Sequence, residues 1–403
     1  MMNYLISAYS VNPYKGSEDS IGWNWVLQYE KNYKEGDRII LLTKKFNEKD
    51  TRRGLKEFNI QHVELVIVDV PNALNWFREK HSAFHHMYYI LWQHWAWLWV
   101  KHSGINFDVI HHVTMNDYRI PSEMYKAKGA KVIWGPMGGA QVTPKPLKVY
   151  EKNQLVANFR ELVNKSCSWN PFYKKALRSY YKIYCINSET QKQISRIVGK
   201  DVPLMPELAL RDEYKNLPIQ KRKNNILKIV FVGRLIGKKG IAFLVDALSL
   251  MPTDMEWELL IFGDGDDRAL IEKQIADSGI EKNIKLMGNR PLNQIAEAYQ
   301  QADIFVLPSL RETSGNVLLE AMAYAVPIVA FDTSFCRLLK KVDCGVFVNT
   351  EQALDDIKAD YCKAIVTLGQ DKELAKQMGL NGYKYVNSKL TWDGKYRIIV
   401  NDM

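Results

Sequence analysis

The second half of the chain alternates between short apolar runs and stretches with helical periodicity. The apolar runs read ILKIVFVG, WELLIFGD, IKLMG, DIFVLPS, PIVAFD and GVFV. Between them, an apolar residue recurs every three or four positions near 239–250, 267–278, 292–301, 317–325, 335–341, 351–367 and 371–386. Such runs are typical of strands buried on both faces, and helices of this length serve as crossovers between parallel strands. The pattern predicts an α/β fold with a doubly wound parallel sheet.

The first half repeats this scheme less regularly, with candidate strands at 3–9, 38–43, 63–69, 108–113, 131–135 and 182–187. The sequence therefore predicts two Rossmann-like domains in tandem. Prolines at 203, 206 and 218 and a basic run interrupt the periodicity. We expect an N-terminal domain over 1–205 and a C-terminal domain over 206–386. A final helix over about 387–403 is expected to pack back on the first domain.

Residues 84–100, FHHMYYILWQHWAWLWV, break the pattern of the first half with an aromatic-rich helical segment. At about 100° per residue, one side of this helix carries Phe84, Met87, Tyr88, Leu91, Trp95, Leu98 and Trp99. Its histidines and glutamine make it a poor membrane span. Two interpretations stay open: a helix lying in the lipid headgroup layer, flanked by cations, or an aromatic helix packed on its own sheet.

The net charge of +10 is unevenly distributed. Residues 1–205 carry 29 Lys and Arg against 18 Asp and Glu, whereas residues 206–403 carry 26 against 27. The first half also holds nine of the eleven tryptophans. Some of its cations lie in PFYKKALRSYYK at 171–182, where they share one helix face, which is also typical of a solvated surface. We expect an anionic partner for the first half, and not nucleic acid, because no nucleic-acid-binding motif accompanies the charge.

The overall composition is that of a folded protein. Hydrophobic residues make up 47% and charged residues 25% of the chain, which excludes disordered and collagen-like classes. The five cysteines show neither CxxC nor zinc-ribbon spacing, so we expect reduced thiols and no structural metal. The N-terminal MMNYLISAYS reads as a first strand and not as a signal peptide. These features predict a cytoplasmic protein, with peripheral contact at the inner face of the cytoplasmic membrane as a further hypothesis.

Two glutamates eight residues apart stand out in IFVLPSLRETSGNVLLEAMAYAVPIVAFD, residues 304–332. A strand runs through a turn into a helix that starts near 314–317, with Glu312 before the helix and Glu320 inside it. Backbone N–H groups at such a helix N-terminus favour an anion such as a diphosphate. Glu320 would then accept hydrogen bonds from ribose hydroxyls, and Glu312 from a sugar beyond the phosphates. A capped crossover helix with an ordinary glutamate is the alternative. The candidate phosphate-contacting residues are Ser314, Gly315, Asn316 and Val317.

The segment VFVGRLIGKKG, residues 230–240, carries a second candidate. Arg234 follows the first strand of the second domain, and Lys239 opens the next helix. Two cations on one strand-to-helix loop can hold a pyrophosphate, with arginine as a planar fork and lysine as a point charge. The loop is neither a Walker A motif nor GxGxxG. A solvated basic loop is the alternative interpretation.

The segments GRLIGKKG, LLIFGDGDDRALIE, IKLMGNRPLNQIAEAYQQADIFVLPSLRETSGNVLLEAMA and PIVAFD together resemble the donor half of retaining, two-domain GT-B glycosyltransferases of family 4, also called group 1. The resemblance covers nearly all of 226–350. It implies a GT-B architecture with the active site in the cleft between the domains. It also implies that Glu312 and Glu320 are the family's paired glutamates and that Arg234 and Lys239 bind the donor diphosphate. Ala325 departs from the family, which usually has glycine there.

The same resemblance, less sharp elsewhere, adds further candidates. Contacts with the nucleotide base are implied near Gly263, Asn289 and Arg290. In the first half, the loop VNPYKGSEDSIGWNWV borders the donor phosphates in such enzymes, so Gly16 and Gly22 are candidate donor contacts.

FDVIHHVT at 107–114 places His111 and His112 at the carboxyl end of a strand, where family members often have a functional histidine. Adjacent strand residues face opposite ways, so one of the two is expected to face the cleft, and the sequence does not say which.

The predicted function is metal-independent sugar transfer with net retention, from a nucleoside-diphosphate sugar to a hydroxyl of a glycan. No DxD-like site is evident, and no cofactor is expected. The catalytic candidates are Glu312, Arg234, Lys239, His111 and His112. The basic, tryptophan-rich first half favours a lipid-linked acceptor at an anionic membrane, as in bacterial surface polysaccharide synthesis (O-antigen, capsule or exopolysaccharide). The alternatives are a nucleotide-sugar epimerase of the same architecture and a non-catalytic scaffold that binds sugar nucleotides.

Overall fold

The chain forms two compact units, each built on its own parallel sheet. The computed structural model describes residues 1–16, 18–71, 85–151, 154–219, 226–312 and 315–401. Unit 1 comprises Met1–Ala140, Asn164–Leu208 and the chain from Trp392 onward. Unit 2 comprises Gln141–Val163 and Ala209–Thr391.

The sheet of unit 1 has six parallel strands in the order β3-β2-β1-β4-β5-β6. They are β1 (Asn3–Ser7), β2 (Arg38–Thr43), β3 (Val63–Ile67), β4 (Val109–His112), β5 (Lys131–Met137) and β6 (Lys182–Cys185). This is the doubly wound order, in which the connections diverge between β1 and β4. All six strands were predicted from the apolar runs. The central strands are buried on both faces, as their continuous apolar sequences require.

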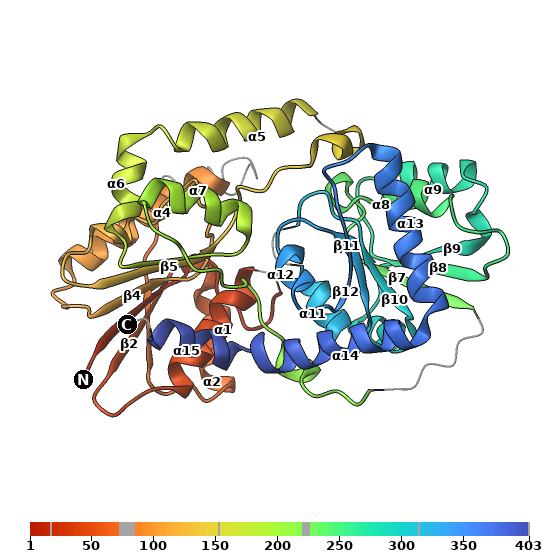
Figure 1. Ribbon diagram of the computed structural model, residues 1–403. Helices are drawn as coiled ribbons and strands as arrows, with labels where there is room; N and C mark the ends of the chain where they lie inside the picture. Colours follow the sequence, from red (N-terminus) through yellow and green to blue (C-terminus); the bar gives the residue numbers. More distant parts are fainter. Residues whose placement is uncertain (17, 72–84, 152–153, 220–225, 313–314, 402–403) are drawn as a thin grey trace. The chain divides into compact units, whose positions relative to one another are not determined.

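Within the described residues, the helices that belong to unit 1 alone are α1 (Glu18–Lys31), α2 (Glu48–Glu57), α4 (His85–His102), α6 (Pro171–Ser179), α7 (Ser188–Val198) and α15 (Trp392–Asn401). The last helix returns to unit 1 from the far end of the sequence and lies beside α1 (Figure 1). Aromatic pairs join them, with ring centroids 5.7 Å apart for Trp25 and Trp392 and 5.3 Å apart for Tyr29 and Tyr396. Edge-on aromatic pairs of this kind add to the stability gained from buried area.

The aromatic segment that the sequence left open is helix α4, and one face of it packs on its own sheet. Its core-facing residues are Tyr88, Tyr89, Trp92, Ala96 and Val100. The face predicted from helical periodicity is wrong by about one position, because Met87 is exposed while Tyr89 and Trp92 are buried. Phe84 lies outside the described residues. Most of the aromatic bulk of α4 therefore serves the core of unit 1.

The sheet of unit 2 repeats the same topology in the order β12-β11-β10-β7-β8-β9. Its strands are β7 (Leu227–Val232), β8 (Trp257–Phe262), β9 (Ile284–Gly288), β10 (Ile304–Leu307), β11 (Ile328–Phe331) and β12 (Gly345–Val348). The surrounding helices are α8 (Ile241–Leu248), α9 (Arg268–Asp277), α10 (Leu292–Gln301), α11 (Asn316–Ala323), α12 (Cys336–Lys340), α13 (Leu354–Gln370) and α14 (Lys372–Lys389) (Figure 1). Every strand and helix predicted for this half is present.

The grouping of residues differs from the expected boundaries in three places, the first being that unit 1 extends to Leu208 and not to 205. Residues 141–163 lie with unit 2, where Tyr150 donates a hydrogen bond to Asp246 (2.6 Å) and Arg311 pairs with Glu151 (3.0 Å). Helix α5 (Gln154–Cys167) follows, and the division falls within it. At the other end, α14 continues to Lys389, and a separate helix begins at Trp392. The contacts of 141–151 are between distant parts of the sequence, so periodicity alone does not reveal them.

Candidate functional site

In unit 2, the connections diverge between the neighbouring strands β7 and β10. The chain after β7 leads to β8 on one side, and the chain after β10 leads to β11 on the other. Doubly wound sheets bind ligands outside the carboxyl ends of the strands at this switch point. Arg234 and Lys239 follow β7, and Glu312 follows β10, so the topology brings the predicted residues to the same edge.

The two loops at this edge touch each other through a glycine. Gly240 has a φ of +69°, and a Cβ atom there would lie 1.9 Å from the carbonyl oxygen of Pro308. The backbone N–H of Leu310 also donates to the carbonyl of Lys238 at 2.9 Å. Only glycine permits both this conformation and this approach. Gly240 therefore fixes the separation of the two loops.

Lys239 and Glu312 form an ion pair across this contact. Lys239 Nζ lies 2.6 Å from Glu312 Oε2, which also accepts a hydrogen bond from Ser309 Oγ at 3.0 Å. Both side chains are largely shielded from solvent, at 18% and 10% exposure. The ammonium group and the hydroxyl replace water contacts that this buried carboxylate has lost. The sequence placed both residues at the site but did not predict their pairing.

Cations outnumber carboxylates around this ion pair. Burial and then the neighbouring charge of Lys239 lower the pKa of Lys238, with smaller contributions in the same direction from Arg311 and Arg234 and an opposing one from Glu312. Within the described ranges, the exposed Arg234 side chain has neither a hydrogen bond nor an ion pair. An edge with several like-charged cations favours a polyanionic ligand.

Helix α11 begins beside Glu312, as the sequence predicted. Gly315 precedes it in the left-handed conformation with φ +59°, and a Cβ atom there would lie 2.8 Å from Leu318 Cδ1. Asn316 is exposed and Val317 is half-buried at the first turn. Ser314 lies outside the described residues. The N–H groups of the first turn lack partners within the helix, which favours an anion there.

Glu320 lies inside α11 and is held by two residues from other elements. Tyr299 of α10 donates its hydroxyl to Glu320 Oε2 at 3.2 Å, and Arg211 Nη2 lies 3.4 Å from Oε1. Burial raises the pKa of Glu320, and Arg211 and then Tyr299 oppose this shift. A carboxylate held by such donors keeps its ability to accept further hydrogen bonds.

Gly263, Asn289 and Arg290 follow the strands β8 and β9, at the same edge of the sheet. Gly263 has a φ of +127°, and a Cβ atom there would lie 2.0 Å from the carbonyl oxygen of Gly233. Asn289 and Arg290 are exposed, and Arg290 Nε donates to the carbonyl of Met287 at 2.8 Å. Their proposed contact with a nucleotide base stays a prediction.

In unit 1, His111 and His112 are both fully buried at the end of β4. His111 faces α1, where its Nδ1 lies 3.3 Å from the Tyr29 hydroxyl and its Nε2 lies 3.2 Å from the carbonyl oxygen of Gly135. His112 faces the opposite way, with Nδ1 2.9 Å from Ser7 Oγ and Nε2 2.9 Å from the Tyr89 hydroxyl.

Burial lowers the pKa of each histidine to about 3, so both rings are neutral at physiological pH. Sequence analysis expected one of the two rings to face the cleft, but within unit 1 both rings are buried. Both ring nitrogens of both residues already have partners, so neither is placed to accept a proton from a substrate. The physical reason is that covering elements lie on both faces of β4, as on any central strand of a doubly wound sheet.

The two predicted glycines of unit 1 differ in their surroundings. Gly22 is buried inside α1, and a Cβ atom there would lie 2.1 Å from the carbonyl oxygen of Ser10. Its close backbone approach is therefore to the loop after β1 of its own unit. Gly16 is exposed, with nothing within 4 Å of its Cβ position. Contact of either glycine with a donor stays a prediction.

Glu18 is a titratable group that the sequence analysis did not single out. It lies in the first turn of α1 and accepts a hydrogen bond from Met115 N at 2.9 Å, so it joins the loops that follow β1 and β4. Burial, and then the charge of Glu207, raise its pKa to about 8. A glutamate at a helix start usually reads as a capping residue, so nothing in the sequence signals this shift.

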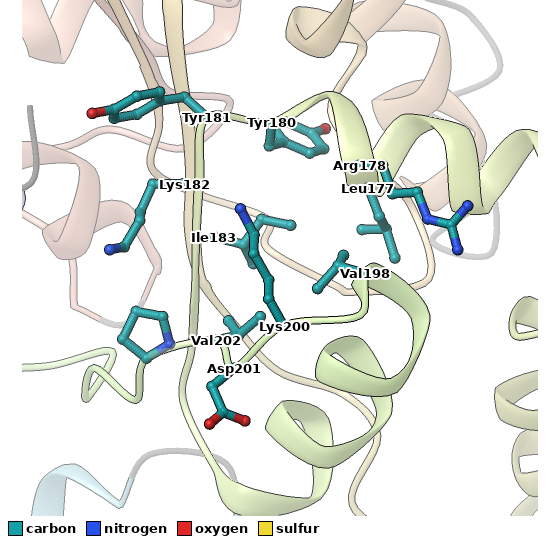
Figure 2. Close-up of a pocket in the computed structure, with 11 residues that line it drawn as sticks. Leu177, Arg178, Tyr180, Tyr181, Lys182, Ile183, Val198, Lys200, Asp201 and Val202 are labelled. Carbon is teal, nitrogen blue, oxygen red and sulfur yellow. The ribbon is translucent and has the colours of Figure 1, made fainter.

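Three further observations concern ligands and membranes. A pocket of about 240 Å³ opens in unit 1 at the amino end of β6, opposite the edge that carries His112. Lys200 extends across this pocket toward Tyr180 (Figure 2).

Among the residues described, no three His, Cys, Asp or Glu side chains gather where they could hold a metal ion. In the same part of the chain, every helix is too short or too polar to cross a bilayer.

Comparison with known proteins shows a family likeness for unit 2. Residues 227–371, most of unit 2, match the family model described as glycosyl transferases group 1. Unit 2 is thus similar to the group 1 glycosyltransferases over most of its length. This family consists of sugar-transferring enzymes, and the match contains Arg234, Lys239, Glu312 and Glu320.

Curated relatives of the chain align over very different shares of its length. The amylovoran biosynthesis glycosyltransferase AmsK of Erwinia amylovora is 33% identical over 134 residues, which is 32% of this chain and 33% of AmsK. The glycosyltransferase MJ1178 of Methanocaldococcus jannaschii is 25% identical over 299 residues, 73% of this chain and 79% of that protein. The alignment with AmsK thus spans about a third of its length.

Solved structures show the GT-B fold over the whole chain. WaaG, a glycosyltransferase involved in lipopolysaccharide biosynthesis, superposes with a TM-score of 0.61 at 15% identity, covering 98% of this chain and 99% of WaaG. HepE of Anabaena, solved in complex with UDP, gives a TM-score of 0.62 at 14% identity with both chains fully covered.

Sequence reasoning missed three side chains at this site: Arg211, Tyr299 and Ser309. Ser309 is three residues before Glu312, so the hydrogen bond from its hydroxyl to this carboxylate could have been predicted from their spacing in the sequence. Arg211 and Tyr299 are 109 and 21 residues from Glu320 and have no motif around them. Only the folded unit reveals them.

Proposed function

We propose that this protein is a glycosyltransferase that transfers a sugar from a nucleoside-diphosphate sugar to a hydroxyl group of a glycan acceptor, with retention of configuration and without a metal ion. The cation-rich edge between β7 and β10 is the observation that carries this proposal. It combines an exposed Arg234, the Lys239–Glu312 pair and the start of α11. The structures of HepE with UDP and with UDP-glucose support a donor of this class.

The main electrostatic requirement of this reaction is to stabilise the negative charge of the leaving group. As the glycosidic bond breaks, negative charge grows on the diphosphate, and preorganised cations stabilise it most in a site that excludes water. Arg234 supplies a planar fork and Lys239 a point charge for the phosphate oxygens. Lys239 is paired with Glu312 in the free protein. A bound diphosphate must therefore either share Lys239 with Glu312 or replace Glu312 as its partner. Glu312 is then released to accept hydrogen bonds from the sugar.

The second glutamate is assigned to the nucleoside. Glu320 lies one turn inside α11, and Tyr299 and Arg211 fix its carboxylate. In this proposal it accepts hydrogen bonds from the ribose hydroxyls while the first turn of α11 faces the phosphates. The acceptor hydroxyl attacks from the face that the diphosphate leaves, which gives net retention.

We assign the acceptor to unit 1 and propose that it is a lipid-linked glycan of a surface polysaccharide. The names of AmsK, in amylovoran biosynthesis, and WaaG, in lipopolysaccharide biosynthesis, support this substrate class. The excess of cations in residues 1–205 supports peripheral contact between unit 1 and an anionic membrane.

A thermal-shift screen of the purified chain tests the donor site. UDP, GDP, ADP, CMP and their sugars are added in EDTA and then in magnesium. Binding to the folded state raises the unfolding midpoint through mass action. We expect a shift with one diphosphate that persists in EDTA and is lost in Arg234→Ala and Glu320→Ala. The absence of a shift with every nucleotide would overturn the donor site.

Product analysis tests the reaction itself. With the donor so identified and a glycan acceptor, proton NMR of the new anomeric centre reports its configuration, and parallel reactions in EDTA report the metal requirement. The donor incubated without acceptor is the control, because an epimerase would convert the sugar there. Inversion, a loss of activity in EDTA or conversion without acceptor would each contradict the corresponding part of the proposal.

A further inference from the structure

Two large aromatic side chains are exposed to solvent where α5 ends and α6 begins. Trp169 is 85% exposed and Phe172 is 81% exposed, and both belong to unit 1. Full exposure of tryptophan is unusual, because its large apolar area favours burial. Contiguous exposed apolar groups on a soluble domain mark surfaces that contact something else. We call residues 165–182, which contain this pair, the α5–α6 corner.

The corner is a fixed part of unit 1. Asn170 Oδ1 caps α6 by accepting hydrogen bonds from Phe172 N (2.9 Å) and Tyr173 N (3.2 Å). On its inner face, Tyr173 and Leu177 join the hydrophobic core of unit 1, and the hydroxyl of Tyr173 donates to the carbonyl of Tyr118. The aromatic pair is thus held outward by a capped and anchored helix.

The sequence around the aromatic pair is rich in positive charge. Between Glu161 and Glu189 the sequence has five cations and no acidic residue; the cations are Lys165, Lys174, Lys175, Arg178 and Lys182. Lys165, Lys175 and Arg178 are exposed. Within the described part of the chain, Lys165, Lys174 and Lys175 form no ion pair. An acidic surface that approached the corner would therefore meet no carboxylate from this stretch.

The pocket of Figure 2 extends the same cationic surface from α6. Leu177 and Arg178 of α6 contribute to it, and Lys182 and Lys200 are among its other lining residues. The only acid among its lining residues is Asp201. Its rim thus combines apolar and cationic groups as the corner does.

Aromatic side chains beside cations are suited to the headgroup layer of an anionic bilayer. Tryptophan prefers the boundary between headgroups and acyl chains, and lysine and arginine are attracted to the surface potential. We propose that the α5–α6 corner docks the protein on anionic lipid, with Trp169 and Phe172 inserted at the interface. This inference rests on the membrane contact in the proposed function and deepens it by assigning the contact to the corner and not to α4, whose Trp92 and Tyr89 lie in the core.

Vesicle sedimentation tests the proposal with the full chain. Vesicles of phosphatidylcholine alone are compared with vesicles that contain about a third phosphatidylglycerol. We expect binding to the anionic vesicles only. We expect W169A/F172A to weaken the partition coefficient about tenfold or more. The triple variant K165A/K174A/K175A should weaken it to a similar degree and reduce its salt dependence.

Phe46→Ala is the matched control, because Phe46 is an aromatic residue of unit 1 that is 61% exposed and lies near Lys15 and Lys44. It should leave vesicle binding unchanged. Thermal midpoints and nucleotide-induced shifts should be unchanged in all variants, because the substituted side chains are on the surface. These shifts report the donor site independently, so failure of the docking proposal is distinguishable from failure of the proposed function.

Three results would overturn the proposal. The first is a wild-type chain that ignores anionic vesicles, and the second is binding that W169A/F172A leaves intact. The third is a change of sedimentation-velocity mass in W169A/F172A with unchanged vesicle binding, since a second copy of the chain would then cover the corner.

Discussion

The two units share one strand order but differ in what they place at the carboxyl edge of their sheets. In unit 2 this edge presents the exposed Arg234 and the Lys239–Glu312 pair. In unit 1 the corresponding strand β4 ends in His111 and His112, both fully buried with all four ring nitrogens paired. The shared topology therefore determines where a site can form, but not whether the residues there can bind a ligand. Exposure and unsatisfied charge decide which of the two edges is chemically available.

The largest effect is expected from Arg234→Ala. Loss of one preorganised charge contact to a leaving group lowers kcat/KM by about 10²–10³-fold. The unfolding midpoint should stay unchanged, because Arg234 has no hydrogen bond or ion pair among the described residues. Steady-state kinetics and thermal unfolding measure the two quantities. Arg268→Ala, at an arginine of the same unit paired with Glu272, is the control and should retain activity. Full activity of Arg234→Ala would contradict the idea that the carboxyl edge of unit 2 stabilises the leaving group.

A pair of glycine substitutions compares the two edges directly. A Cβ atom at Gly240 would overlap the carbonyl of Pro308 at 1.9 Å, and one at Gly22 would overlap that of Ser10 at 2.1 Å. Each alanine variant should lose about 2–4 kcal/mol of unfolding free energy, measured in urea. We expect Gly240→Ala also to abolish the nucleotide-induced thermal shift, because it separates the two loops of the site. Loss of that shift in Gly22→Ala, with the fold intact, would support the predicted contact of Gly22 with the donor.

The Lys239–Glu312 pair can be measured by a double-mutant cycle. Removal of Lys239 leaves a shielded carboxylate with a weaker set of donors, so Lys239→Ala should cost about 1–3 kcal/mol of unfolding free energy. The double variant with Glu312→Ala should recover part of this loss, which gives a coupling energy of similar size. Additive losses in urea unfolding would show that the two charges do not interact in solution.

The buried histidines predict a pH dependence that belongs to unit 1. Their pKa values of about 3 in the fold lie below the value of about 6.5 in an unfolded chain. The unfolded state therefore binds more protons between these values, and stability falls as the pH is lowered through this range. Each histidine contributes a slope of up to about 1.4 kcal/mol per pH unit.

Urea unfolding at pH 5.0, 5.5, 6.0 and 6.5 measures this slope. His111→Gln should be less stable at pH 7 but should show a shallower dependence on pH. Exposed His102 is the matched control position, where His102→Gln should leave the slope unchanged. An unchanged slope in His111→Gln would mean that His111 is accessible to protons in the native state.

The smallest effect is expected at the opposite edge of unit 2. Ala325 lies between α11 and β11 with a φ of +52°, a conformation that costs a residue with a Cβ atom about 1 kcal/mol. Ala325→Gly should therefore raise the unfolding free energy by about 0.5–1 kcal/mol. Because this position is at the amino end of β11, nucleotide-induced shifts should stay as in the parent chain. A destabilised variant would show that the Ala325 methyl group contributes more by packing than its backbone conformation costs.

Local patterns were sufficient for most of the fold. Strands such as β10, with the sequence IFVL, are continuous apolar runs, and their burial on both faces follows from the parallel topology. The resemblance to a known family placed Arg234, Lys239 and Glu312 at one edge, and the strand order agrees with this placement. Helix α4 shows the limit of periodicity, because an aromatic-rich helix has no clear polar face and its buried side was predicted about one position away.

The sequence by itself determined the two doubly wound sheets, the family of unit 2 and the uneven charge of the halves, because these depend on residue types at short spacing. Tertiary structure alone decided that Arg211 and Tyr299 hold Glu320, that residues 141–163 join unit 2, and that both histidines are buried. Each of these depends on groups far apart in the chain. Contact, desolvation and pKa are properties of neighbours in space, and neighbours in space are set only when the chain folds.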